Sequence, residues 1–240
     1  MHRHPNVRAK PCFPVTRHQG SSVLRGVAVV LLTLGFFCAI SASAEEQGPV
    51  KSLLEMRHQD VIVQHFDLSC GAAALATLLD YQFGEHFTEK QVAEGLIARK
   101  EYIAHPEILR IRQGFSLLDM KRYVDKLGFQ GIGYGQLELK DLIRLAPIIV
   151  AVRPIGYNHF VVFRGKVGDE VLLADPAFGN RAMQVNKFER IWINFPQFGR
   201  VGFIVTRKGT PAPPGQLAAR PNLFIAPPAE FVRQVLFNRL

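Results

Sequence analysis

Cysteine is scarce in this sequence, which holds only Cys12, Cys38 and Cys70 among its 240 residues. Cys12 and Cys38 lie in residues 1–44, whose composition is typical of a segment that is removed on export. The remaining chain would keep a single thiol, so no internal disulfide could form and a disulfide-stapled scaffold is excluded. A lone exported thiol is either a reactive cysteine or a small buried apolar residue, and the cysteine count alone favours neither.

Acidic residues are missing from the first 44 positions, and no apolar run there is long enough for a membrane span. Residues 1–25 carry five basic residues, an apolar run follows from Gly26 to Ile40, and Ala42-Ser43-Ala44 resembles a cleavage site. This order is typical of a secretory signal peptide, because an apolar core of about 15 residues falls short of the roughly 20 of a spanning helix. We therefore expect residues 1–44 to be a signal peptide, with an uncleaved anchor as the alternative.

The formal net charge of +9 depends largely on that same segment. Removing residues 1–44 takes away five of the 29 basic residues and none of the 20 acidic ones, which leaves a net charge of +4. Binding to nucleic acid then loses most of its support. The sequence also lacks a metal-ligand spacing, a phosphate loop and a nucleotide motif, so we expect no cofactor and no metal.

Helical patterns occupy the first half of the expected mature chain, and strand patterns occupy the second half. Residues 70–81 are rich in alanine and leucine and apolar nearly all round, which predicts a central buried helix. Thr88 with Gln91 and Ser116 with Asp119 have the spacing of capping boxes. Further elements are expected as a helix at 139–145 and strands at 147–153, 159–166, 170–174, 191–194 and 201–206. We predict an α+β fold in which the helical half packs on an antiparallel sheet.

Composition divides the mature chain into a domain and a tail. Residues 45–207 are expected to form one domain, and residues 208–240 are rich in proline, which is typical of a linker rather than a core. Residues 229–240 have the pattern of a short amphipathic helix, which would either dock on the domain or bind a partner.

Gln64 and Cys70 form the first half of a candidate catalytic site, with Cys70 expected at the very start of the alanine-rich helix. The thiolate is the reactive form of cysteine, and the positive end of a helix favours an anion. The backbone amide of Cys70, beside the small Gly71, and the side-chain amide of Gln64 can both donate to a developing oxyanion. We predict Cys70 as the nucleophile and Gln64 as part of the oxyanion hole.

His159 and Asp175 form the second half of this site. His159 begins a predicted strand after a polar turn, and Asp175 closes the next strand, so an antiparallel hairpin would bring the two side by side. The carboxylate would meet the imidazole nitrogen that faces away from the thiol. Considered alone, a histidine in a strand or an aspartate after one more often has a structural role than a catalytic role. The placement of His159 and Asp175 side by side favours a catalytic role for both. None of the other histidines of the mature chain begins a predicted strand: His58, His65, His86 and His105.

These residues resemble the peptidase C39 family, the double-glycine leader peptidases of bacteriocin export. The resemblance spans about residues 55–206 and is carried by the stretches 64–75, 114–129, 158–162 and 175–176. The family's Gln, Cys, His and Asp fall in order on Gln64, Cys70, His159 and Asp175. The resemblance implies a papain-like fold and hydrolysis of a peptide bond after a small, glycine-like pair.

Family members tied to export carry membrane helices and a nucleotide-binding part, whereas this chain is expected to carry a signal peptide and neither of these. It is more similar to the stand-alone periplasmic C39-like proteins of functional-amyloid secretion systems. That resemblance implies a periplasmic location and a secreted polypeptide, such as an amyloid subunit or export component, as substrate. Glycine-type specificity would need a narrow cleft, lined by Tyr157 or Trp192. Two alternatives stay open: a catalytically silent C39-like module that binds an extended segment, and acyl transfer to an amine instead of water.

Overall fold

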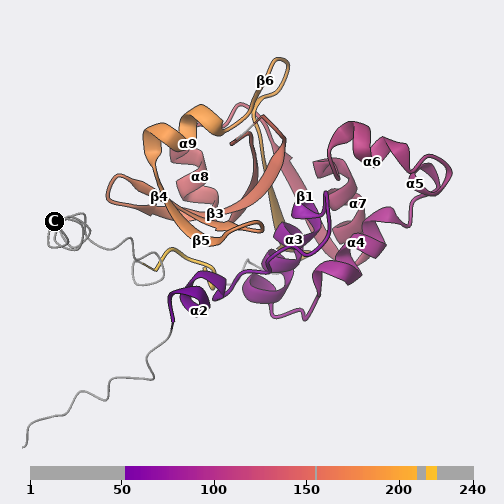
Figure 1. The fold of residues 1–240 in the computed structure, drawn as a ribbon, viewed down its shortest axis with the longest axis horizontal. Coiled ribbons are helices and arrows are strands. Elements are labelled where there is room, and N and C mark those ends of the chain that lie inside the picture. The colour runs from indigo at the N-terminus through magenta and orange to yellow at the C-terminus, as the bar shows by residue number, and fades with distance from the viewer. Residues whose placement is uncertain (1–51, 155, 210–214, 221–240) are drawn as a thin grey trace, which may run out of the picture. The chain divides into compact units, whose positions relative to one another are not determined.

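The computed structural model describes residues 52–154, 156–209 and 215–220, and these form a six-stranded antiparallel sheet with helices on both faces (Figure 1). The expected signal peptide, residues 1–44, and the expected terminal helix, residues 229–240, lie outside the described residues. None of the helices within the described part combines the length and the apolar character that crossing a membrane requires. The predicted α+β class is confirmed.

Helices fill most of the chain before the sheet begins. Helix α3 (Cys70–Thr77) starts at the predicted residue. The capping boxes predicted at Thr88 and Ser116 are both formed, which confirms the starts of α4 (Glu89–Ile97) and α7 (Leu117–Lys126). The other helical segments are α2 (Leu53–His58), the π-helix η1 (Leu78–Gln82), α5 (Lys100–Ala104), α6 (Glu107–Arg112), α8 (Leu139–Leu145) and α9 (Val185–Ile191).

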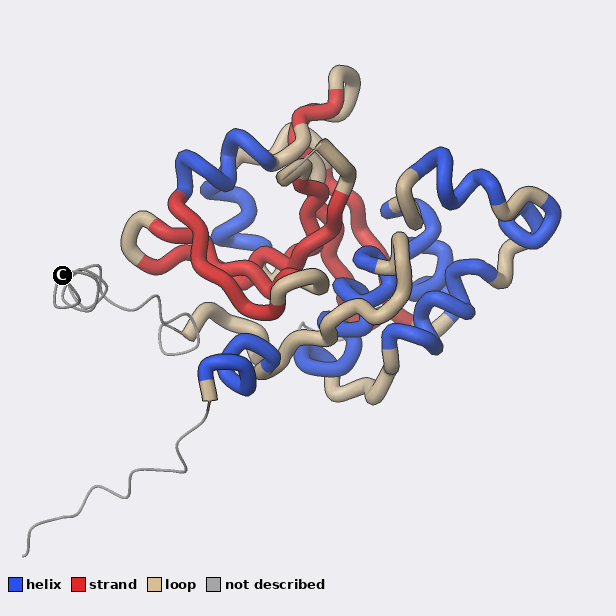
Figure 2. The backbone as a smooth tube through the Cα atoms, in the orientation of Figure 1, coloured by secondary structure: helices blue, strands red, loops and turns tan. Residues whose placement is uncertain are grey.

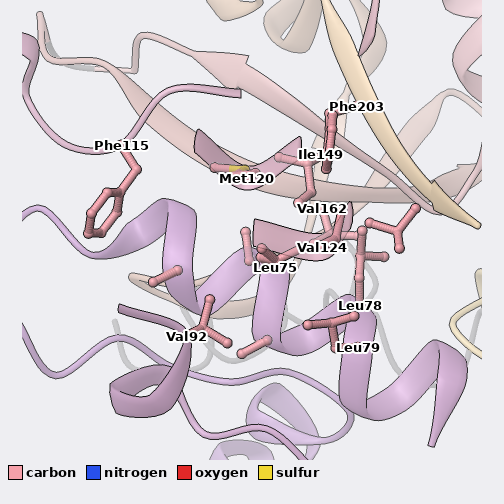
Figure 3. Packing of buried hydrophobic residues seen from close by; sticks show 14 of the residues in the cluster. Leu75, Leu78, Leu79, Val92, Phe115, Met120, Val124, Ile149, Val162 and Phe203 are labelled. Atoms are coloured by element: carbon pink, nitrogen blue, oxygen red, sulfur yellow. The ribbon is translucent and has the colours of Figure 1, made fainter. Parts of the chain in front are cut away.

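Helix α3 lies at the centre of the molecule, as its alanine-rich pattern predicts, and every one of its residues is buried. Leu75 of this helix belongs to one apolar cluster with Met120 of α7 and with Ile149 and Val162 of the sheet (Figure 3). Burial of one such side chain contributes about 1.5–3 kcal/mol to stability. The middle of α3 is therefore held by packing against both α7 and the sheet.

The sheet has the strand order β1-β8-β2-β3-β4-β5, with all neighbours antiparallel. Ile149 and Val162 face the cluster around α3, whereas Val150 and Phe163 pack in a second cluster with residues of α8 and α9. Figure 2 shows helices on both sides of the sheet. Strands β1 and β5 were not predicted, and the other four match predicted ranges. The bounds are β1 (Phe129–Tyr134), β2 (Ile148–Val152), β3 (His159–Val167), β4 (Glu170–Asp175), β5 (Gly179–Gln184) and β8 (Gly202–Arg207).

The strand predicted at residues 191–194 is wrong in most of its length. Residue 191 ends helix α9, Trp192 makes a single bridge to Val152, and only then does the short β6 (Asn194–Phe195) pair with β7 (Gly199–Arg200). The ring of Trp192 stacks on Phe188 of α9 with centroids 5.5 Å apart, and both are buried. One helical turn places these two rings together, and local β-propensity does not reveal such a contact.

Part of the segment that was expected to be a linker packs into the core. Leu217 is fully buried. Its N–H donates to Gln82 Oε1 at 3.1 Å, and its carbonyl accepts from Arg164 Nε at 2.9 Å. Because both of its main-chain polar groups are satisfied by buried side chains, residues around 217 belong to the folded domain.

Candidate active site

Cys70 is the first residue of α3 and borders an open cleft. Only 5% of its surface is exposed, but it lines a cavity of about 220 Å³. It is a free thiol. The structure thus excludes a thiol sealed in apolar packing, which was the alternative to a reactive cysteine. The other residues that line the cavity are Gln64, Leu68, Gln113, Tyr157, Asn158, His159 and Ala177.

His159 lies across this cleft at the first position of β3, where it pairs with Val152 of β2 in the strand register. Its side chain is 3% exposed. Nε2 of the ring lies 2.8 Å from Asp175 Oδ1, and Cys70 lines the same cavity, close enough to help raise the pKa of the imidazole. Since Nε2 is engaged by the carboxylate, Nδ1 is the nitrogen left for the sulfur. The predicted geometry, with the carboxylate on the nitrogen away from the thiol, is therefore found.

The electrostatics of the site favour a charged imidazole. Burial opposes the charge and lowers the pKa of His159, but its hydrogen bonds to Asp175 and Cys70, together with their negative charges, raise that pKa to about 9. At neutral pH the imidazole therefore carries a proton, as it would beside a thiolate.

Asp175 is the last residue of β4, and its carboxylate makes contacts beyond His159. Oδ1 also accepts from the backbone N–H of Ala177 at 2.9 Å, and Oδ2 pairs with Arg181 Nη1 at 3.3 Å. Sequence reasoning missed Arg181 because it predicted no strand for residues 179–184. The run Arg181-Ala182-Met183-Gln184 is polar at both ends and apolar in the middle, so it lacks the alternation that would have indicated a strand.

Gln64 reaches the cleft from the loop before α3. Its backbone N–H donates to the carbonyl of Pro176 at 2.8 Å, which ties this loop to the turn that follows Asp175. Its side-chain Nε2 lies 3.4 Å from the carbonyl of Phe66, a weak hydrogen bond. Its Oε1 is buried and, among the described residues, has no hydrogen-bond partner. The amide thus lies in the cavity with a second N–H available for an oxygen atom there.

Of the two aromatic residues expected to line a narrow cleft, only Tyr157 does so. Its ring centroid is 5.9 Å from that of His159. Trp192 is 2% exposed and donates Nε1–H to the carbonyl of Val201 at 3.2 Å, so it belongs to the core. Gln113 was not predicted as part of the site, yet its Oε1 accepts from the backbone N–H of Asn158 at 3.1 Å across the cleft. Its left-handed backbone, at φ 58°, closes α6 in the way a glycine often does, and only the following Gly114 hints at this.

No group of three or more His, Cys, Asp or Glu side chains within the described residues could hold a metal ion. The arrangement offers a nucleophile, a base and hydrogen-bond donors from its own side chains. Such a set can perform acyl transfer through a thioester.

Comparison with known proteins points in the same direction. The sequence pattern of the Peptidase C39 family matches residues 58–196. A protein of Pseudomonas aeruginosa described as "Probable functional amyloid protease FapD" is 40% identical over 194 residues, which cover 80% of this chain and 82% of the relative. The protein of the same description from Pseudomonas fluorescens is 36% identical over 143 residues, 60% of this chain and 61% of that one.

One solved structure is that of a double glycine motif protease from an AMS/PCAT transporter in complex with the leader peptide. It is 25% identical, covers 62% of this chain and 91% of its own, and superimposes with a TM-score of 0.48.

Proposed function

The chain belongs to the peptidase C39 family and is a cysteine peptidase, and we propose that it is exported and cuts a secreted polypeptide of a functional-amyloid system. The observation that supports catalysis most directly is the buried imidazole of His159, which hydrogen-bonds to Asp175 and lines the same cavity as Cys70. The support for the amyloid system is the description of the Pseudomonas relatives as functional amyloid proteases.

In the proposed reaction, the Cys70 thiolate attacks the carbonyl carbon of the scissile peptide bond. A bond from Sγ to carbon forms, and the carbonyl electron pair moves onto oxygen. The backbone N–H of Cys70 and the side-chain amide of Gln64 stabilise that oxyanion, and loss of one such donor costs about 100-fold or more in rate. The oxyanion then collapses, the C–N bond breaks, and the His159 imidazolium gives its proton to the leaving amine.

A thioester of the amino-terminal fragment remains on Cys70. Neutral His159 next accepts a proton from a water molecule, whose oxygen attacks the thioester carbon. The C–S bond breaks, the acid is released, and the thiolate–imidazolium pair is restored. Asp175 holds the imidazole in the required orientation in both halves of the reaction through its bond to Nε2.

We further propose that the residue before the cut is small, such as glycine. Leu68 and Tyr157 border the cavity beside Cys70, which has a volume of only about 220 Å³. Bulk beside a nucleophile excludes long side chains. Export to the periplasm is part of the same proposal, supported by the signal-like order of residues 1–44.

Replacement of Cys70 by alanine tests the enzymatic proposal. In the bacterium that makes this protein, the candidate secreted polypeptides are followed by mass spectrometry with the parent chain and with Cys70→Ala. We expect cleavage to fall at least about 10³-fold, because the covalent step has no other nucleophile. The outcome that would overturn the proposal is unchanged cleavage with the variant.

The same masses distinguish the two alternatives. Hydrolysis adds one water across the cut, whereas acyl transfer joins the fragment to an amine. A silent binding module would leave the polypeptide intact with the parent chain and would affect only its secretion.

A further inference from the structure

Glu89, the first residue of α4, is a buried acid that the catalytic chemistry described above does not use. It is 5% exposed. Its carboxylate faces the loop that joins Gln64 to Cys70. Oε2 accepts from the backbone N–H of His65 at 2.9 Å, and Oε1 accepts from the backbone N–H of Phe66 at 3.3 Å and from the hydroxyl of Ser69.

These bonds hold both ends of the loop. His65 directly follows Gln64, and Ser69 directly precedes Cys70, so each contact lies one residue from a group of the site. The hydroxyl of Ser69 makes no cap bond to its own helix, although the residue occupies the N-cap position of α3. Its single hydroxyl proton is instead shared between two acceptors, Glu89 Oε1 at 2.5 Å and the carbonyl of Phe66 at 2.6 Å.

The loop needs such support because its backbone is strained. Leu68 has a positive φ of 63°, which is unfavourable for a branched side chain. A residue in this region persists only where its surroundings fix it. Besides the bonds to Glu89, the start of the loop is tied to the Pro176 carbonyl through the Gln64 N–H at 2.8 Å. The ring of His65 is 78% exposed and its Nδ1 lies 2.9 Å from the carbonyl of Val63 and 3.4 Å from Glu89 Oε2.

Burial of a carboxylate is unfavourable unless hydrogen bonds replace its water. Here the replacement hydrogen bonds come from the loop amides and from Ser69. The place of Glu89 in the first turn of α4, at the positive end of the helix, also favours its negative charge. Glu89 and the loop therefore depend on each other, and neither can rearrange without leaving polar groups unsatisfied.

We propose that Glu89 is a positioning residue that sets the separation between the Gln64 amide and the Cys70 thiol. It acts through the loop and touches neither the substrate nor the reacting atoms. This inference rests on the proposed peptidase mechanism, in which both groups must reach the same carbonyl. A misplacement of about 1 Å at such a site can cost about 100-fold in rate.

Glu89→Gln is the substitution that tests this role, because it keeps the shape of the side chain. The substitution replaces one carboxylate oxygen by an NH₂ group, which donates hydrogen bonds and cannot accept them. In either orientation of the amide, this NH₂ group faces a backbone N–H of the loop, which is also a donor. The loop then relaxes, while the packing of α4 is unchanged.

The experiment is a double-mutant cycle with Gln64→Ala, measured on a cleaved peptide substrate. We expect Glu89→Gln to lower kcat about 10- to 100-fold in the parent with little change in KM, since substrate contacts are unaltered. In the Gln64→Ala background it should lower kcat by less than about 3-fold, because the donor that it misplaces is already gone. Equal losses in the two backgrounds would show a general loss of structure and would overturn the proposal.

Glu94→Gln is the matched control. Glu94 lies on the same helix, its side chain is 65% exposed, and its pairing with Lys90 is loose at 3.8 Å. We expect less than about a 2-fold change, as for most surface substitutions. Ser69→Ala removes only one of the bonds to Glu89. In the same cycle with Gln64→Ala, its effect on kcat should be non-additive in the same direction but smaller. Additive effects of the two substitutions on kcat would count against the proposal.

Amide hydrogen exchange separates this inference from the proposed function. The amides of His65 and Phe66 should exchange at least about 10-fold faster in Glu89→Gln than in the parent or in Glu94→Gln. Unchanged protection would overturn the positioning role whether or not the protein cleaves peptides. If the parent itself cleaves no peptide, the proposed function fails, while the exchange measurement still decides whether Glu89 holds the loop.

Discussion

The two halves of the site are held in place by different means. The base and its carboxylate lie on neighbouring antiparallel strands, where the register of β3 and β4 fixes their positions through main-chain hydrogen bonds. The nucleophile starts a packed helix, but the Gln64 side-chain amide lies on an irregular loop in which the backbone N–H groups of His65 and Phe66 both donate to one buried side chain, Glu89. The sheet half is therefore sensitive to changes in its backbone, and the loop half is sensitive to a single side chain.

This difference follows from the hydrogen-bonding needs of each backbone. Strand residues satisfy their N–H and C=O groups with the next strand, so no side chain is needed. A loop that enters a helix has free N–H groups, and a side-chain oxygen must take them. Three substitutions on the sheet side, together with one matched control, test this contrast, from the largest expected effect to the smallest.

Asp175→Asn removes the charge from the sheet half while leaving its strand register intact. We expect kcat/KM to fall about 100-fold or more, because the amide can favour the wrong tautomer of His159. The alkaline limb of the kcat/KM profile, expected near pH 9 in the parent, should move to lower pH because the carboxylate is one cause of the raised pKa of His159.

Stability provides a second measurement on the same variant. The folded-state pKa of His159, about 9, lies above its ordinary value of 6.5. The charged imidazole therefore stabilises the fold fully below pH 6.5, and this contribution is lost as the pH rises through about 9. Asp175→Asn should be less stable than the parent at pH 6, with a gap that narrows above pH 9. An alkaline limb that does not move would show that the carboxylate does not control the imidazole.

Gly179→Ala tests whether the backbone of the sheet half matters as much as its side chains. Gly179 pairs with Asp175 in the register of β4 and β5, has φ +77°, and its added Cβ would lie 2.5 Å from the carbonyl oxygen of Arg57. We expect a loss of about 2–4 kcal/mol in the free energy of unfolding, from the unfavourable φ and the clash together. Activity should fall as well, because the turn carries Asp175.

Gly168→Ala is the matched control for that substitution. Gly168 has φ +55° at the other end of β4, and an added Cβ would meet nothing within 4 Å. Gly168→Ala should lower the free energy of unfolding by only about 1–2 kcal/mol, because of the unfavourable φ alone, and should leave kcat/KM unchanged. Equal stability losses for the two variants would show that contact with α2 plays no part.

Arg181→Gln should have the smallest effect. Arg181 pairs with Asp175 Oδ2 at 3.3 Å, and its side chain is 28% exposed. Without the positive charge of Arg181, the Asp175 carboxylate stabilises the His159 imidazolium more strongly. The alkaline limb of the kcat/KM profile should therefore move to higher pH, by less than about one unit. The rate should change by no more than about 3-fold. A shift of the limb to lower pH would contradict this account of the charges around Asp175.

Some features of the site could be predicted because their signals are local. Cys70 opens an alanine-rich helix and His159 opens a strand, and both positions follow from neighbouring residues. Glu89 and Gln113 were missed because their partners, His65 and Asn158, lie far away in the sequence. Arg181 lies near Asp175 in the sequence and was missed because no strand was predicted for its segment. Trp192 was placed wrongly because the residues before it form α9, which puts its ring on Phe188, while its Nε1–H meets the Val201 carbonyl in the core.

The sequence by itself determined the α+β class, the starts of the central helices and the four side chains proposed for catalysis, because periodicity, capping patterns and residue chemistry act over a few positions. Only the tertiary structure decided which polar groups meet across the cleft and which residue holds the loop between Gln64 and Cys70. The sequence does not show which acceptor a given backbone N–H will meet in the fold. Once that N–H is buried, leaving it without an acceptor is energetically costly, so the pairing matters for stability.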